Sequence, residues 1–228
     1  MFSIRLKCIF CLFFGLTSLL NAQENTTGYW QPHIDVNYKV ATNYKHNFSL
    51  AKRNYTYRNS TIEFTVRQID IAHFSTLKIA SNQSIGLGIQ YRFRTLLDNS
   101  KDDELRFTQQ YNYTKKIGAL RVGNRLRTEQ RITTELTTYR FRYRIAADAP
   151  LNGEVLDVGE PYLVISTEAL LSVAHTKLPE YDQRVTASIG WRLKENLKFQ
   201  LGSEFRIEDY THNRDYVVFL LTGIILAL

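Results

Sequence analysis

Arginines are the residues in this sequence whose type and spacing could do chemistry. Between residues 119 and 147 they lie two or four positions apart along two neighbouring segments, so that within each segment they share one parity. A guanidinium is always charged and presents its N–H groups as a planar fork that matches a carboxylate or a phosphate. The pattern therefore predicts a surface that binds anions or is neutralised by carboxylates. The arginines concerned are Arg121, Arg125, Arg127 and Arg131, then Arg140, Arg142 and Arg144.

Such strict alternation is typical of a β-strand with two unlike faces. Opposite the second row of arginines lie apolar side chains: Tyr139, Phe141, Tyr143 and Ile145. Unpaired charge in a dry core costs several kcal/mol per ion, so the arginine face must meet water or acidic partners. Two architectures satisfy both faces. One is a soluble barrel with arginines outside, and the other is a membrane barrel with arginines lining the lumen.

If the arginine face of these two strands is continued through the other expected strands, fourteen Arg and Lys residues and four carboxylates fall on that face. A wet pore with this excess of positive charge would prefer anions. Twelve strands leave little free space once arginines project inward, so a plugged structural lumen and a narrow anion-preferring pore both remain open. The expected lumen-lining residues are Arg92, Arg94, Arg106, Arg121, Arg125, Arg127, Arg131, Arg140, Arg142, Arg144, Arg184, Arg192, Lys198 and Arg206, against Glu129, Glu168, Glu204 and Glu208.

His73 and Ser75 are the candidate catalytic residues, because a histidine base can activate a serine hydroxyl. Their spacing resembles the His-x-Ser of lipid A deacylases, in which the pair lies on a lipid-facing strand. The resemblance implies a lipid hydrolase as an alternative function. The Asn-Ala-Gly expected after that serine is replaced by Thr76, Leu77 and Lys78. The sequence therefore favours a non-enzymatic barrel.

No cofactor or metal is expected from the histidines, which are scattered without paired-ligand spacing. His175, near Glu168 and Asp182, has no serine nucleophile beside it in a recognisable context. The five histidines are His33, His46, His73, His175 and His212.

Residues 1–22 have the features of an export signal. Arg5 and Lys7 precede an apolar run from Cys8 to Leu20, which is too short to cross a membrane as a helix. Cleavage after Ala22 would leave residues 23–228 as a single barrel domain without cysteines, and therefore without disulfides. The full chain has 29 Lys and Arg residues and 22 Asp and Glu residues. Removal of the signal takes away two of the cations, Arg5 and Lys7, so the remaining chain has a net charge of +5. An exported chain of this kind is not expected to bind nucleic acid.

Hydrophobic content of 44% with a mean hydropathy of −0.28 excludes a helical membrane protein but fits barrel strands, which are apolar only at alternate positions. The clear strands run about ten to thirteen residues, the length of a tilted spanning strand. We count eleven strands if residues 61–79 form one strand and twelve if they form two. An even number would place both ends of the barrel at the periplasmic rim, so we predict about twelve, with ten as the fallback. The predicted fold is all-β, an antiparallel up-and-down transmembrane β-barrel.

Two local features are also predicted. The apolar parity changes between Phe48 and Tyr55, which indicates a β-bulge. The stretches from Asp98 to Glu104 and from Asp209 to Asp215 are expected to be exposed loops and plausible contact surfaces.

Several short motifs resemble an uncharacterised family of outer-membrane β-barrels common in Bacteroidota, a domain-of-unknown-function family. The resemblance implies a porin-like barrel in the outer membrane of a Gram-negative bacterium, with no activity attached. Expected partners are outer-membrane lipid, the barrel-assembly machinery and small anionic solutes. An exported soluble barrel that holds an apolar ligand remains a further alternative. The motifs are Gly28 to Trp30, Gly86 to Arg94, Arg106 to Gln110, Arg125 to Arg131, Arg140 to Arg144, Thr167 with Glu168, and Tyr181 to Arg184.

Overall fold

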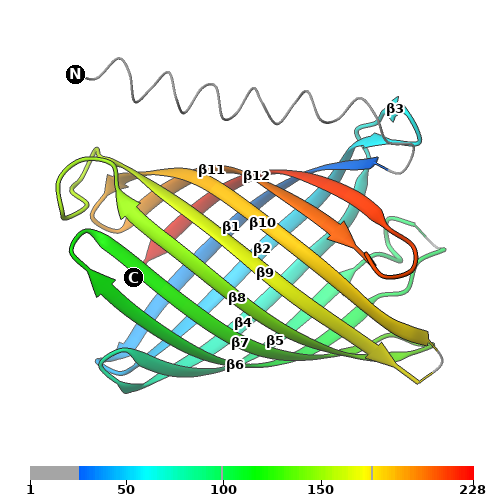
Figure 1. The fold of residues 1–228 in the computed structure, drawn as a ribbon, viewed down its shortest axis with the longest axis horizontal. Helices are drawn as coiled ribbons and strands as arrows, with labels where there is room; N and C mark the ends of the chain where they lie inside the picture. Colours follow the sequence, from blue (N-terminus) through cyan, green and yellow to red (C-terminus); the bar gives the residue numbers. More distant parts are fainter. Residues whose placement is uncertain (1–25, 99, 176) are drawn as a thin grey trace.

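The computed structural model describes residues 26–98, 100–175 and 177–228, so the expected signal peptide at 1–22 lies outside the described residues. The described chain forms one twelve-stranded sheet that closes into a barrel (Figure 1). In this part of the chain, no helix is long and apolar enough to cross a membrane. The predicted all-β barrel and the total of twelve strands are confirmed. The strands are β1 (Thr26–Ala41), β2 (Tyr44–Arg58), β3 (Thr61–Ile62), β4 (Val66–Ala80), β5 (Gln83–Phe93), β6 (Glu104–Ile117), β7 (Leu120–Ile132), β8 (Thr137–Pro150), β9 (Pro161–Ala174), β10 (Lys177–Lys194), β11 (Leu197–Glu208) and β12 (Asp215–Ala227).

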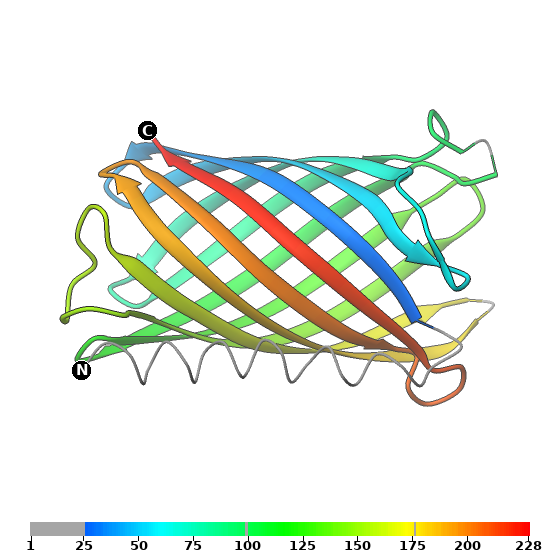
Figure 2. The ribbon, with the colours of Figure 1, turned by 90° about the horizontal axis from the view of Figure 1, so that it is seen from above.

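The barrel wall closes between its first and last strands. β3 has two residues and pairs only with β2, so the other eleven strands make the wall. β1 pairs with β2 antiparallel and with β12 parallel, from Thr26 opposite Tyr216 to Asn37 opposite Ala227. Figure 2 shows these two strands side by side and running the same way. The prediction that both ends of the wall would lie at one rim is wrong, because an odd ring of alternating strands must contain one parallel pair.

The two rims of the barrel carry different connections. Those after β1, β4, β6 and β10 have two residues each, and the one after β8 is longer, from 151 to 160. We call this rim the turn end; it lies at the left of Figure 1. The opposite rim, the loop end, carries the connections after β2, β5, β7, β9 and β11. β12 therefore ends at the turn end, and β1 begins at the loop end.

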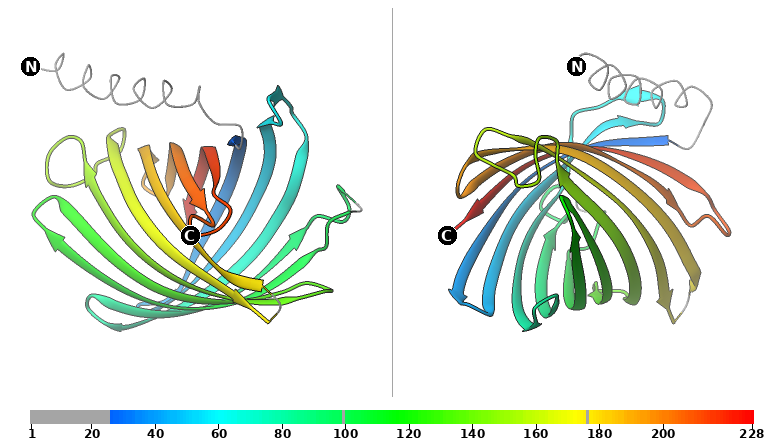
Figure 3. Two further views of the ribbon diagram at one scale, coloured as in Figure 1. Left: turned by 45° about the vertical axis from the view of Figure 1, so that its right-hand side comes forward. Right: turned by 60° about the vertical axis from the view of Figure 1, so that its left-hand side comes forward.

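Alternation along the strands separates an apolar outer wall from a polar interior. Leu126 and Phe141 are 56% and 49% exposed on the outside, whereas Arg127 and Arg142 beside them are largely buried. The curvature of the sheet in Figure 3 turns one face of every strand inward. The distribution is the reverse of that in a soluble protein and is typical of a barrel in lipid.

β2 contains a bulge, but beyond the stretch between Phe48 and Tyr55 where it was predicted. Against β1 the register shifts between Gly28 and Tyr29 and leaves Thr56 as the extra residue, whereas the shift against β4 leaves Arg67 of β4 as the extra residue. Tyr55 lies directly opposite Tyr29 in the regular register, and the centroids of their rings are 5.0 Å apart. Both rings belong to a small apolar cluster around Phe219 at the loop end.

Aromatic rings fill part of the interior by lying across glycines of the neighbouring strand. The Phe74 ring in β4 covers Gly88 in β5, where a Cβ atom would collide with it. The guanidinium carbon of Arg127 lies 5.3 Å from the centre of the same ring. Because glycine has no Cβ atom, the ring can pack directly against the backbone at such a position. The ring therefore reduces the free space on the turn side of the arginines.

Candidate functional site

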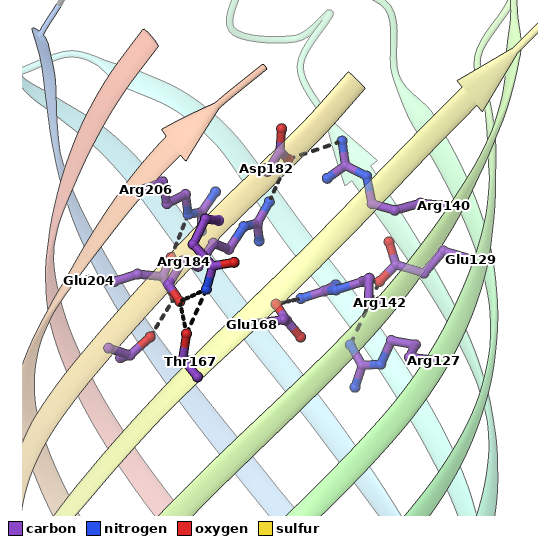
Figure 4. Close-up of polar contacts among 12 residues, drawn as sticks. Arg127, Glu129, Arg140, Arg142, Thr167, Glu168, Asp182, Arg184, Glu204 and Arg206 are labelled. Carbon is purple, nitrogen blue, oxygen red and sulfur yellow. Dashed lines mark hydrogen bonds and ion pairs between the residues drawn. The ribbon is translucent and has the colours of Figure 1, made fainter. Parts of the chain in front are cut away.

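An ion-pair network crosses the interior near the middle of β7, β8 and β9. Arg142 donates from Nη1 to Oε1 of Glu129 and from Nη2 to Oε2 of Glu168, each at 2.5 Å (Figure 4). Oε2 of Glu129 accepts from Nε of Arg131 at 3.1 Å, and Nη1 of Arg127 lies 3.7 Å from Oε1. We call these five residues the central ion-pair layer. Glu129 is only 4% exposed, so its charge is held by the arginines rather than by bulk water.

Strand register places Arg142 between its two carboxylates, whereas Arg127 and Arg131 lie two residues from Glu129 on the same strand. Arg142 lies opposite Arg127 in β7, which leaves Glu129 on the diagonal, within reach of long side chains. Glu168 lies opposite Arg144 and on the diagonal from Arg142. An acidic residue thus meets arginines from two strands.

A second cluster joins β4, β5 and β6. Arg92 makes two hydrogen bonds to Asp70, at 2.7 and 2.9 Å, and its Nη1 lies 3.9 Å from Glu104. Glu104 also pairs with Arg94 at 3.5 Å and with Arg106. The exposed position predicted for Glu104 is wrong, since it is the first residue of β6 and is buried. The sequence analysis missed Asp70, although its alternation with Ile69 and Ile71 was a usable signal.

A third cluster joins β8, β10 and β11. Asp182, which the sequence analysis did not place in the lumen, lies 3.9 Å from Arg140 and 3.6 Å from Arg184. Arg206 donates to Glu204 at 2.5 Å (Figure 4) and lies 3.5 Å from Glu208.

The remaining predicted arginines lie toward the turn end. Arg125 donates to Asn112 at 2.8 Å, and Arg144 lines a small internal cavity. Arg121 is exposed and pairs with Asp148 at 2.9 Å. Arg192 donates to the carbonyl of Leu156 at 2.7 Å and so holds the long connection after β8. Arg121 and Arg192 therefore do not join the network, because they sit at strand ends. Lys198 lies over the Tyr162 ring, its Nζ 5.3 Å from the centroid.

Two internal cavities lie on either side of this network. The loop-end cavity has a volume of about 470 Å³ and extends from buried Arg184 to exposed Asn213. The other has about 230 Å³ and is lined by Arg144 and Glu204, among others. They share no lining residue. In β8 the division falls between residues 142 and 144, in β10 between 184 and 186, and in β11 between 204 and 206. The two cavities therefore meet different halves of β8, β10 and β11.

The rim above the loop-end cavity is organised by Asp103. Its Oδ1 accepts the backbone N–H groups of Arg94 and Thr95, at 2.7 and 2.9 Å. These donors hold the pKa of the Asp103 carboxyl below its ordinary value. The contact fixes the backbone from which the Arg94 side chain reaches into the interior.

The catalytic candidates His73 and Ser75 lie on the outer wall, near the turn end. The structure records no hydrogen bond between them; Ser75 instead lies opposite His46 of β2, with 3.2 Å between Oγ and Nδ1. Nδ1 of His46 is also 2.9 Å from Nε2 of His73. The hydroxyl of Tyr44 donates to Oγ of Ser75 at 3.1 Å. The sequence analysis missed Tyr44 and His46 in this role because only the β2–β4 register brings them there.

Among residues 26–98, 100–175 and 177–228, no three His, Cys, Asp or Glu side chains are placed to hold a metal ion.

Comparison with known proteins gives a family but no activity. No curated protein matches the chain. Among solved structures it resembles OmpT of Vibrio cholerae, an outer membrane protein folded in vitro and in trimer form, at 11% identity and a TM-score of 0.41. The match covers 72% of this chain and 54% of that one, so this chain spans about half the length of OmpT. Residues 27–217 match the family described as "Protein of unknown function (DUF2490)", and the chain belongs to that family.

Proposed function

We propose that this chain is an integral β-barrel of the outer membrane of a Gram-negative bacterium, whose lumen is plugged by the central ion-pair layer. The observation that carries the proposal is the division of the interior into two cavities with no lining residue in common. Its motifs favour an origin in Bacteroidota. Residues 1–22 would direct export and be removed, leaving 23–228 as the barrel.

Three features support insertion in a membrane. The outer wall is apolar along most strands, as exposed Leu126 and Phe141 illustrate. The strands of the wall have 11 to 18 residues, enough for tilted strands to cross hydrocarbon. Two-residue turns dominate one rim, as at the periplasmic end of outer-membrane barrels. The loop end would then face outward, and outer-membrane lipid and the barrel-assembly machinery would be the partners.

The plugged lumen is tested by conductance. The purified barrel, inserted in a planar bilayer, should give no steady current, because the buried ion pairs leave no continuous water path. Detergent extraction and heat-modifiable gel mobility serve as controls for membrane insertion and folding. Steady single-channel steps with an anion-selective reversal potential would overturn the plug and establish the anion-preferring pore instead.

A second candidate function, lipid hydrolysis, is favoured by the contact between Ser75 Oγ and His46 Nδ1. In the tautomer with Nδ1 unprotonated, His46 would take the proton as Ser75 attacks an ester carbonyl. The ester C–O bond would break as the acyl group passes to Ser75, and the leaving alcohol would take the proton from His46. Water would then hydrolyse the acyl-serine, releasing a fatty acid and restoring the serine hydroxyl. The cluster lies near the turn end on the outer wall, where the ester groups of a phospholipid leaflet would be within reach.

Loss of activity in Ser75→Ala tests this candidate. Purified barrel in phospholipid vesicles should release fatty acid, and both Ser75→Ala and His46→Ala should lower the rate by at least about 1,000-fold, as loss of a nucleophile or base does. Ser49→Ala, an inward serine of β2, is the matched control. Equal release by wild type and Ser75→Ala would leave the cluster a polar feature of the wall.

A further inference from the structure

The wall of the loop-end cavity is rich in arginine. Ten arginines and six carboxylates line it, and six of the arginines pair with Glu104, Glu129 or Glu204, which lie outside the lining. The cavity reaches the exposed connection after β11 through Asn213, and Arg142 of the central ion-pair layer lies at its inner end. The cavity is therefore an arginine-rich recess with access from one rim.

Two of its arginines are buried and have N–H groups without a hydrogen-bond partner among the described residues. Arg106 and Arg184 are 6% and 7% exposed. The atoms concerned are Nη2 of Arg106 and Nε of Arg184. A buried donor without an acceptor is costly, more so on a charged group, so an acceptor that either guanidinium could reach by turning toward the cavity would stabilise it.

Two further arginines line the cavity without pairing with a carboxylate. Arg53 donates to the side-chain oxygen of Gln31 at 2.9 Å, and Arg67 donates to the hydroxyl of Tyr29. In the described part of the chain, neither has a carboxylate oxygen within 4.0 Å.

Arg53 and Arg206 both lie over the ring of Phe219. The guanidinium carbon of Arg53 lies 4.8 Å from the centroid of Phe219, and that of Arg206 lies 3.9 Å from the same centroid. Each contact is favourable by itself, but the two like charges repel in a low-dielectric interior. An anion beside them would relieve that repulsion.

We infer that the loop-end cavity is a binding site for a small multivalent oxyanion, taken up from the loop end. Guanidinium forks match the oxygens of phosphate groups, and a volume of about 470 Å³ falls within the range of small-ligand sites. This inference rests on the proposed barrel with a plugged lumen, since an open pore would pass the anion instead of holding it.

Pyrophosphate is the probe for a calorimetric titration of the folded, full-length barrel in a non-ionic detergent and a low-salt buffer. Wild type should bind it with 1:1 stoichiometry, and chloride at the same ionic strength should not compete. Arg53→Gln should weaken binding by roughly tenfold or more, because a charge-assisted contact is lost. Arg53→Lys keeps the positive charge but not the planar guanidinium, so its affinity for pyrophosphate should lie between those of wild type and Arg53→Gln.

Arg121→Gln is the matched control, because Arg121 is an exposed arginine at the turn end, outside the cavity. It should bind pyrophosphate as wild type does, and heat-modifiable mobility should show that every variant is folded. Absence of binding by wild type, or equal binding by folded Arg53→Gln, would overturn the inference. Detergent extraction and the lack of steady current are independent of this titration, so a failed titration with both intact would leave the proposed function standing.

Discussion

Replacing Glu129 with glutamine should destabilise the barrel by about 3–5 kcal/mol, the usual cost of removing one partner of a buried ion pair. Glu129 accepts from Arg142 at 2.5 Å and from Arg131 at 3.1 Å, and Arg127 lies 3.7 Å away. Glutamine has nearly the same shape but no charge, and its NH2 group replaces one acceptor oxygen with a donor, so Arg142, Arg131 and Arg127 lose the negative charge that they share. Urea unfolding of the barrel in lipid vesicles measures the free energy.

Glu135→Gln is the matched control for this prediction. Glu135 lies in the connection after β7 and is exposed, so the same substitution should change the free energy of unfolding by less than about 0.5 kcal/mol. If Glu129→Gln were as mild as the control, the central ion-pair layer would contribute nothing to holding the strands together.

Phe141→Arg should cost about 2–4 kcal/mol of folding free energy if the barrel lies in a membrane, because the substitution places a charge in hydrocarbon near the midplane. Phe141 is near the middle of β8 and faces outward. In a soluble barrel the same arginine would meet water and cost less than about 0.5 kcal/mol. Urea unfolding in vesicles, with the folded fraction read from heat-modifiable mobility, separates the two cases.

The control for Phe141→Arg is the same kind of substitution at an outward position close to the rim of the barrel. Leu120→Arg introduces the same side chain on the outer wall beside the two-residue turn after β6. Near the interface an arginine should cost only about 0–1 kcal/mol. Equal effects at the two positions would contradict a membrane around the middle of the wall.

Alternation made the two faces of the wall predictable from the sequence. Arg127 and Leu126 are neighbours, yet one is largely buried and the other is exposed, because successive residues of a strand point to opposite sides. The pattern depends on local backbone geometry alone. By itself the pattern left eleven or twelve strands open, and the choice of twelve came from the expectation that both ends of the wall would lie at one rim.

The pairing of charges was harder to predict, because it depends on register between strands. Asp182 meets Arg140 from β8, and Asp70 meets Arg92 from β5, at separations along the chain that no local pattern reveals. His46 likewise lies opposite Ser75 only once β2 and β4 are aligned. Glu104 was assigned to a loop because the end of that loop could not be located from its polar composition.

The closure of the wall was missed for a different reason. Residues 61–79 change phase near Arg67, and both one strand and two were compatible with that change. The chain forms a two-residue strand before β4, which adds to the strand total without crossing the barrel. The number of strands in the chain, twelve, therefore differs from the number of strands that form the barrel wall, eleven.

The parallel pairing of β1 with β12 has a consequence for rearranging the chain. Because Thr26 lies opposite Tyr216 while Ala227 lies opposite Asn37, the beginning of the first strand and the end of the last are separated by the length of the wall. That separation is on the order of 36 Å along the strands. A circular permutant would need a linker that runs from one mouth of the barrel to the other, inside the wall or along its outer face.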